Sequence, residues 1–225
     1  MTRVAITTDR FDLAAPAYTD VGLDPVPVPC IQIEPADTEV LASARSAASE
    51  ADLILITSAR TIEQLWPDRS MPAVDVAAVG SATADAIATA GGKVVATGNS
   101  GLAGLVETIS DRLPSARMVY PHAEASDPVA VERLRALAPT LDEFVVYRTI
   151  PIAPASTLVD AVVFTSPSAV AGWLLTRDFE QLVVGVIGST TGAAVARHRL
   201  PDVIASEPSH PALARALNSH LEVTV

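Results

Sequence analysis

The chain has 225 residues, of which 49% are hydrophobic and 18% are charged, and its formal net charge is −11. This length is enough for one large or two small domains with well-packed cores. So acidic a chain offers no basic face to release counterions from a phosphate backbone, which argues against a nucleic-acid partner. The one cysteine, Cys30, excludes an internal disulfide and is typical of a reducing compartment.

No targeting or membrane segment is expected. The amino terminus enters a strand-like run, R-V-A-I-T-T, almost at once, so we predict no signal peptide. The longest apolar stretch without charges, 161–176, is interrupted by T-S-P-S and is too short to span a bilayer. The sequence therefore predicts a soluble, cytoplasmic protein without a membrane partner.

The predicted elements begin with a buried strand over 3–8 and an amphipathic helix near 11–21. Segment 24–34 contains three prolines, each of which keeps the preceding residue extended. Such a segment is typical of an edge strand or of a connector between domains. A helix is expected to open at 35–38 and to run to about Glu50.

Short strands then alternate with helices to the end of the chain. This alternation predicts an α/β fold with parallel sheets that are covered by helices on both faces. Strands are expected near 53–57, 74–79, 93–97, 116–120 and 142–147 and, after a second extended stretch at 147–154, near 160–165, 183–187 and 203–205, with the last helix ending near Ser219.

Two stretches of the chain repeat each other. Residues 76–87 read V-A-A-V-G-S-A-T-A-D-A-I, and residues 184–195 read V-G-V-I-G-S-T-T-G-A-A-V. In each, an apolar run ends in Gly-Ser and a helical pattern follows. One common offset relates Gly80 to Gly188, Ser81 to Ser189, and Thr83 to Thr191.

The repeat extends upstream and downstream of these turns. Residues 52–58, D-L-I-L-I-T-S, and residues 160–166, D-A-V-V-F-T-S, stand at equal distances before them. The repeated unit is too long for a solenoid and indicates two related α/β halves.

The strands divide unevenly between the halves. The second copy of the repeat lacks following strands, and the amino-terminal strand, helix and strand would complete it. The sequence therefore predicts a discontinuous domain of residues 1–35 plus 150–225 and an inserted domain of residues 36–148. The connectors at 25–36 and 147–154 would lie side by side as a two-stranded extended linker, with the active-site cleft between two similar domains.

The Gly-Ser turns point to anion binding. A strand that ends in Gly-Ser before a helix leaves backbone N–H groups at the carboxyl edge of the sheet, where negatively charged oxygens can bind. In the alternative interpretation, the glycine forms a tight turn and the serine merely caps the helix.

Four motifs resemble the uroporphyrinogen-III synthase family. They are V-G-S-A-T-A at 79–84, V-V-Y-R-T at 145–149, F-T-S-P-S-A-V at 164–170 and V-I-G-S-T-T-G-A-A-V at 186–195. Their order and spacing, with a tyrosine between the halves, carry the resemblance over nearly the whole chain. It implies two α/β domains joined by a two-stranded ladder, the first of them built from both chain ends.

The resemblance implies an enzyme of haem, sirohaem and cobalamin synthesis. Its members close the linear tetrapyrrole hydroxymethylbilane into uroporphyrinogen III, releasing water and inverting the terminal pyrrole ring. The reaction is thought to pass through an azafulvene cation and a spiro intermediate, and the family uses no metal or organic cofactor. We accordingly expect a monomer whose partner is the small-molecule substrate.

Tyr147 is the candidate catalytic residue. It matches the tyrosine of the family's V-Y-R-T motif, and its phenol could donate a hydrogen bond to the departing hydroxyl. The structural alternative is a strand aromatic that covers the hinge.

The substrate carries carboxylates and the chain is acidic overall, so local hydrogen-bond donors must outweigh a distant repulsion that salt screens. The turns after the strands offer such donors, and substrate binding is expected there. Thr83 matches the family's threonine in the G-x-x-T turn. Arg10, Arg60 and Arg148 are possible carboxylate clamps, although each could be an ordinary surface residue. The other candidates are turn glycines and residues with polar side chains: Ser58, Gly80, Ser81, Asn99, Ser166, Ser168, Gly188, Ser189, Thr190 and Thr191.

The sequence departs from the family at two places. The family often has a glycine and a basic residue after the strand at 116–120, where this chain has His122, Glu124 and Asp127. The carboxylate-binding role of that loop is therefore open. The opening T-T-D-R also differs from the family's more usual T-R-P, which leaves the role of Arg10 open.

Two other classes of protein compete with this interpretation. A two-lobed cytoplasmic binding protein could close on an anionic small molecule without chemistry, but the usual secretory signal or DNA-binding module of such proteins is not visible. A nucleotide-dependent enzyme is disfavoured because neither G-x-G-x-x-G nor G-x-x-x-x-G-K-[ST] occurs. The histidines show no metal-ligand spacing, which disfavours a metal mechanism.

Overall fold

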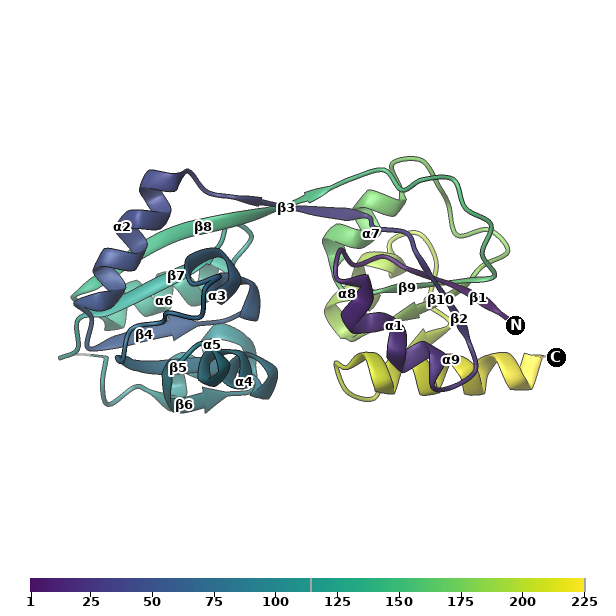
Figure 1. Ribbon diagram of the computed structural model, residues 1–225. Coiled ribbons are helices and arrows are strands. Elements are labelled where there is room, and N and C mark those ends of the chain that lie inside the picture. The colour runs from purple at the N-terminus through teal and green to yellow at the C-terminus, as the bar shows by residue number, and fades with distance from the viewer. Residues whose placement is uncertain (114, 225) are drawn as a thin grey trace. The chain divides into compact units, whose positions relative to one another are not determined.

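The computed structural model describes residues 1–113 and 115–224, with only the backbone of Thr224 included. The chain divides into two compact units (Figure 1). Met1–Gln32 and Ile150–Val225 form what we call the terminal unit, and Ile33–Thr149 form the central unit. The predicted domain boundaries, and the predicted cleft between the domains, stay predictions.

The terminal unit is built on a parallel sheet with the strand order β11-β10-β9-β1-β2. Both chain ends contribute to it, as the count of strands in the repeat predicts. Its strands are β1 (Arg3–Ile6), β2 (Asp24–Pro27), β9 (Ala161–Phe164), β10 (Val183–Val186) and β11 (Val203–Ile204).

Helices cover both faces of this sheet. One core cluster joins the sheet to α1 (Phe11–Thr19) and α9 (His210–Thr224). The other joins it to α7 (Pro167–Trp173) and α8 (Ser189–Ala196). The layering is therefore helix, sheet, helix, as expected for parallel strands with buried faces.

The central unit is built on a sheet with the order β3-β8-β7-β4-β5-β6, in which the strands from β8 to β6 are parallel. The middle strand β4 reads L-I-L-I and is buried at every residue. The strands of the central sheet are β3 (Ile31–Pro35), β4 (Leu53–Ile56), β5 (Asp75–Val79), β6 (Lys93–Gly98), β7 (Met118–Ala123) and β8 (Leu141–Pro151).

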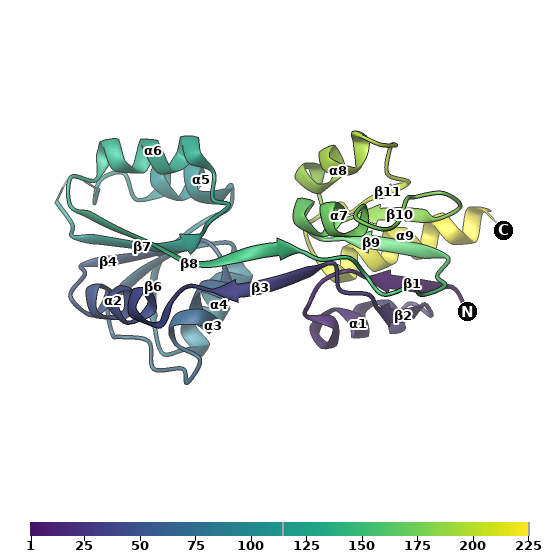
Figure 2. The same ribbon diagram turned by 90° about the horizontal axis from the view of Figure 1, so that it is seen from above.

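Helices also cover both faces of the central sheet (Figure 2). One core cluster contains α2 (Thr38–Ser49), α3 (Ala59–Leu65) and α4 (Ser81–Thr89). The opposite cluster contains α5 (Gly101–Thr108) and α6 (Pro128–Leu137). The α/β class and the parallel sheets predicted from the sequence are confirmed.

The proline-rich segment supplies two edge strands. β2 ends the terminal sheet and β3 ends the central sheet, where a missing proline N–H costs no ladder hydrogen bond. The predicted extended linker is also confirmed, because β3 lies next to β8. Ala36 N–H donates to Val146 O at 3.0 Å and Ile152 N–H donates to Cys30 O at 2.9 Å, so these stretches run antiparallel.

Two elements extend beyond the sequence prediction. The strand predicted at 116–120 continues through Pro121 and His122 to Ala123. On its β4 side the pairing stops at Val119, so Pro121 is paired with β8 alone and its missing N–H does not interrupt a second ladder. The last helix continues past Ser219 to Thr224, and Leu221 packs against the core of the terminal unit. Within the described residues, no helix combines the length and the apolar character needed to cross a membrane.

Candidate functional site

The predicted site residues of the central unit gather at one edge of its sheet. Because β8, β7, β4, β5 and β6 are parallel neighbours, the residues at their carboxyl ends follow one another along that edge. In sheet order they are Tyr147 and Arg148 on β8, Ser58 and Arg60 after β4, Gly80, Ser81 and Thr83 after β5, and Asn99 after β6.

The terminal unit repeats this arrangement. Its predicted residues follow β10, β9 and β1, which are neighbours in the sheet. They are Gly188, Ser189, Thr190 and Thr191 after β10, Ser166 and Ser168 after β9, and Arg10 after β1. Each unit thus carries one edge lined with backbone N–H groups and hydroxyls.

Two serines of the set cap helices. Ser58 Oγ accepts the Arg60 N–H at 3.2 Å, and Ser166 Oγ accepts the Ala169 N–H at 3.2 Å. Ser58 and Ser166 therefore act as helix caps, whereas the capping alternative raised from the sequence concerned the serines of the two Gly-Ser turns. A hydroxyl that accepts such a bond keeps its own hydrogen, which can still be donated to a ligand oxygen.

The two Gly-Ser turns lack such caps. No side-chain capping hydrogen bond is recorded at the start of α4 or of α8 within the described residues. No capping side chain therefore accepts a hydrogen bond from the first-turn N–H groups of either helix, which leaves these groups available to an anionic oxygen. Ser81, Ser189 and Thr190 are exposed or partly exposed at these helix starts.

The turn threonines lie deeper than the serines. Thr83 is 7% exposed and Thr191 is 3% exposed, so both side chains belong mainly to the packing beneath the turns. Asn99, by contrast, is exposed just after β6. A ligand at the central edge would meet Ser81 and Asn99 before it met Thr83.

Tyr147 lies in the core of the central unit and is 5% exposed. It also lines a cavity of about 260 Å³, together with Glu34, Glu124 and Arg148. Its carbonyl accepts the Glu124 N–H at 3.0 Å beside the register shift between His122 and Ala123. β-bulges often re-aim side chains next to active sites, so this position suits a functional tyrosine.

Arg148 is already engaged with a carboxylate. Its Nε and Nη2 donate to the two oxygens of Glu34 at 3.0 and 2.8 Å, with both side chains about half exposed. The hydrogen bond from Arg148 lowers the pKa of Glu34. A substrate carboxylate would have to compete with Glu34 for this guanidinium.

The other two arginines stand at helix starts. Arg10 occupies the position before α1, and its N–H donates to Thr8 Oγ1 at 3.3 Å. Arg60 is the second residue of α3. Both are partly exposed at the carboxyl edges of their sheets.

Sequence reasoning missed a polar cluster at the carboxyl end of β7. His122 is 7% exposed and stacks on Tyr120, with ring centroids 4.5 Å apart. Its Nδ1 lies 2.8 Å from Ala123 O and 3.0 Å from Ser126 Oγ. Because the carbonyl can only accept, Nδ1 carries the hydrogen.

This cluster is tied to its neighbours. Tyr120 Oη donates to Ser126 Oγ at 3.5 Å, and burial raises the pKa of Tyr120. His122 Nε2 lies 3.9 Å from Glu143, which also accepts two hydrogen bonds from Arg135 at 2.7 and 2.9 Å. The alternation of Tyr120 and His122 along one strand was the available signal, but Pro121 between them suggested a loop.

A third residue of this loop, Asp127, has a structural role. Asp127 accepts the N–H groups of Val129 and Ala130 at 3.0 and 3.4 Å and so caps α6. Across residues 1–113 and 115–224, no group of three or more histidines, cysteines or carboxylates could hold a metal ion.

Comparison with known proteins identifies relatives of this chain. The family model described as uroporphyrinogen-III synthase HemD matches residues 13–215. No curated protein has a matching sequence.

Solved structures share the fold. A mutant uroporphyrinogen III synthase from the extremely thermophilic bacterium Thermus thermophilus has a TM-score of 0.63 and 16% identity, over 99% of this chain and 100% of that one. The uroporphyrinogen-III synthetase from Helicobacter pylori has a TM-score of 0.65 and 16% identity, over 99% of both chains.

Proposed function

Because this chain belongs to the uroporphyrinogen-III synthase family, we propose that its two sheet edges bind hydroxymethylbilane for closure to uroporphyrinogen III. The assignment of this reaction rests on the family match over residues 13–215. That reaction makes the chain a cyclising lyase of tetrapyrrole biosynthesis, which releases water and inverts the terminal pyrrole ring.

Shape control is the main task in this proposal. The unassisted substrate loses its hydroxyl and cyclises without inversion, so the enzyme must hold the one folded conformation that leads to the inverted product. The uncapped first turns of α4 and α8 support this role, because they offer N–H groups to substrate carboxylates. The side chains of Ser81, Asn99 and Ser189 can add hydrogen bonds.

Tyr147 is the proposed general acid. Its phenol donates a proton to the hydroxyl oxygen as the C–O bond breaks, so that water departs and the azafulvene cation remains. The substituted α-carbon of the terminal ring attacks this cation and forms the spiro intermediate. The bond from that carbon to its original methylene bridge then breaks, which leaves a second azafulvene cation on the preceding ring. The free α-carbon of the terminal ring closes the macrocycle at this bridge, and the proton it loses as the ring regains aromaticity restores the phenol. The location of Tyr147 beside a cavity of about 260 Å³ supports the assignment.

The setting of the reaction is part of the proposal. We propose a cytoplasmic enzyme that acts as a monomer and needs neither a metal nor an organic cofactor. Arg10, Arg60 and Arg148 are proposed to hold carboxylates, with Arg148 exchanging Glu34 for the substrate.

A coupled isomer assay tests the function. Freshly made hydroxymethylbilane is supplied, the product is oxidised, and the type I and type III isomers are separated chromatographically. We expect mainly type III with the protein and only type I in a control without it. Type I alone, at concentrations where a known synthase gives type III, would refute the proposal.

A further inference from the structure

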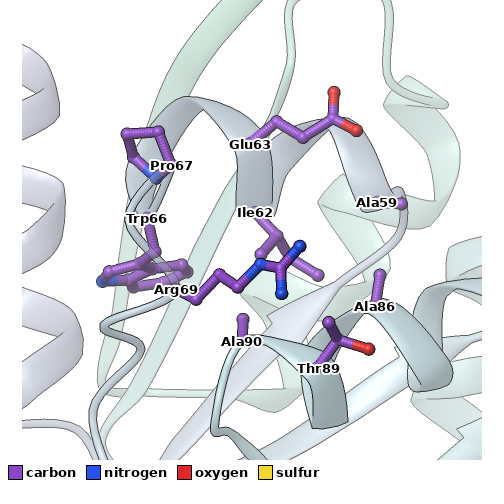
Figure 3. Close-up of a pocket in the computed structure, with 9 residues that line it drawn as sticks. All are labelled: Ala59, Ile62, Glu63, Trp66, Pro67, Arg69, Ala86, Thr89 and Ala90. Atoms are coloured by element: carbon purple, nitrogen blue, oxygen red, sulfur yellow. The ribbon is translucent and has the colours of Figure 1, made fainter.

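A groove lies between α3 and α4 on the central unit (Figure 3). It encloses about 390 Å³. Small-molecule sites commonly measure roughly 300–1,000 Å³, so this groove has the size for a small ligand. The sides of the two helices line it, whereas the proposed catalytic residues lie at the sheet edge.

Small residues create the groove. Ala86 in α4 and Ala90, which directly follows α4, line one side of the groove. Ile62 in α3 and Trp66, which directly follows α3, line the other. Alanine side chains leave space that a leucine would fill. Ile62 is 5% exposed and Trp66 is 4% exposed, so the floor is apolar and firmly packed in the core.

Arg69 supplies a cation to this apolar groove. Its φ of 62° lies in the left-handed region, which is unfavourable for residues other than glycine, and its N–H donates to Trp66 O at 3.0 Å. Figure 3 shows the Arg69 side chain reaching across the groove, while the Glu63 carboxylate points away from it. Among the residues that the structure describes, no ion pair of Arg69 is recorded.

Arg69 is exposed at the rim of the groove, and its guanidinium, with no ion pair recorded among the described residues, stands over an apolar floor; an apolar lining with one such polar group suits a small anionic ligand. We propose that this groove binds a small aromatic carboxylate. The carboxylate accepts two hydrogen bonds from the Arg69 guanidinium, and the ring lies on Ile62 and Trp66.

Thr89 narrows the class of ligand. Its hydroxyl hydrogen is donated to Asp85 O at 2.8 Å, so its oxygen is left to accept a hydrogen bond from the ligand. A ring with its own N–H, such as a pyrrole carboxylate, meets both Arg69 and Thr89. This assignment uses the groove alone and does not depend on the proposed function.

Nuclear magnetic resonance tests the site with pyrrole-2-carboxylate as the probe. The chain has two tryptophans, and Trp66→Phe identifies the indole N–H signal of Trp66. We expect the probe to shift that signal saturably, with the Trp173 signal unchanged. Pyrrole-2-carboxamide, which has no charge, should bind at least tenfold more weakly.

Matched variants complete the test. Arg69→Gln should weaken binding at least tenfold, and Ala86→Leu should fill the groove and abolish binding. Arg133→Gln, a change at an exposed arginine of α6 that pairs with Glu107, should leave binding unchanged. Equal binding by Arg69→Gln, equal shifts at both tryptophans, or the absence of a saturable shift would overturn the proposal.

Discussion

At the scale of single residues, Tyr147 is both a core residue and a wall of a cavity. Its ring packs in the cluster that contains Ile56 and Val146, and only 5% of the residue is exposed. A phenol in such a position has few alternative orientations, which favours a fixed hydrogen bond to a departing hydroxyl. Removing the hydroxyl while keeping the ring separates the chemical role from the packing role.

We predict that Tyr147→Phe lowers kcat by about 100- to 1,000-fold, the lower part of the range for general acids, because water would leave without a proton donor. KM should change less than about twofold, since the carboxylate-binding turns are untouched. Steady-state kinetics measure both values.

The control for Tyr147→Phe is Thr83→Ala, which should reduce kcat less. An unchanged kcat in Tyr147→Phe would remove this tyrosine from the mechanism and leave it a packing residue.

Cys30 gives a prediction for alkaline pH. The thiol is fully buried, and desolvation raises its pKa from 9.0 to about 12, against a smaller opposing effect of Arg177. Because the pKa is higher in the folded state, the contribution to stability is complete below pH 9 and is lost as the pH rises toward 12.

The free energy of unfolding should therefore fall above pH 9 by at most about 1.4 kcal/mol per pH unit. Urea unfolding between pH 8 and about pH 9.5 measures this slope, and because tyrosines with the usual pKa of about 10 begin to ionise there, the contribution of Cys30 is the difference from Cys30→Ala. Cys30→Ala should flatten it, whatever its effect on absolute stability. An equally steep slope in Cys30→Ala would contradict the assignment.

At the scale of the elements, the repeated Gly-Ser turns look alike in sequence and differ in backbone conformation. Gly80 has a φ of 75° and donates its N–H to Gly98 O at 2.8 Å, so its turn is fixed by the neighbouring strand. Gly188 has a φ of 178°, an extended conformation open to any residue, and a Cβ there would have no neighbour within 4 Å.

We predict that Gly80→Ala lowers the free energy of unfolding by about 1–2 kcal/mol, because an L-residue pays a steric cost in the left-handed region. Gly188→Ala should raise it by at most about 1 kcal/mol, since no strain is introduced and the unfolded chain loses conformational freedom. Urea denaturation followed by circular dichroism compares the two. Equal losses of stability would mean that the two turns do not differ in this way.

The sequence predicts most elements, because the alternation of apolar runs and helical patterns is strong from Leu53 onward. It misses the carboxyl end of β7, where Pro121 is typical of a strand breaker. Only the strand pairing shows that Pro121 does not break the strand, since the pairing of β7 with β4 ends at Val119, before Pro121 is reached. The stacked pair of Tyr120 and His122 was missed for the same reason.

Site residues are predicted less completely than elements. The repeat places the Gly-Ser turns at the sheet edges, because parallel strands must end there. It does not reveal that Arg148 is paired with Glu34, since these residues are distant in sequence and meet only through the pairing of β3 with β8. Contacts between distant strands are invisible to local periodicity.

At the scale of the whole molecule, a net charge of −11 opposes a substrate that carries many carboxylates. The repulsion acts over long distances, whereas the turns and arginines act at contact. Salt screens charges beyond about 8–10 Å near physiological ionic strength, so it weakens the repulsion more than the contacts.

We therefore predict that kcat/KM rises by about two- to fivefold as sodium chloride increases from about 20 to 150 mM, because encounter becomes less repulsive. Initial rates at low substrate concentration measure this effect. A steady fall of kcat/KM with salt would instead show that attraction by Arg10, Arg60 and Arg148 dominates the encounter.

The central claim is that hydrogen bonds from the sheet edges fix the substrate's shape and thereby the isomer that forms. Ser81→Ala combined with Asn99→Ala removes two exposed donors of the central unit without touching Tyr147. The ratio of type I to type III product tests the claim directly. We predict that this double variant, while folded, releases a larger share of type I, whereas Tyr147→Phe forms type III more slowly. A wild-type ratio and rate in the double variant would contradict the account.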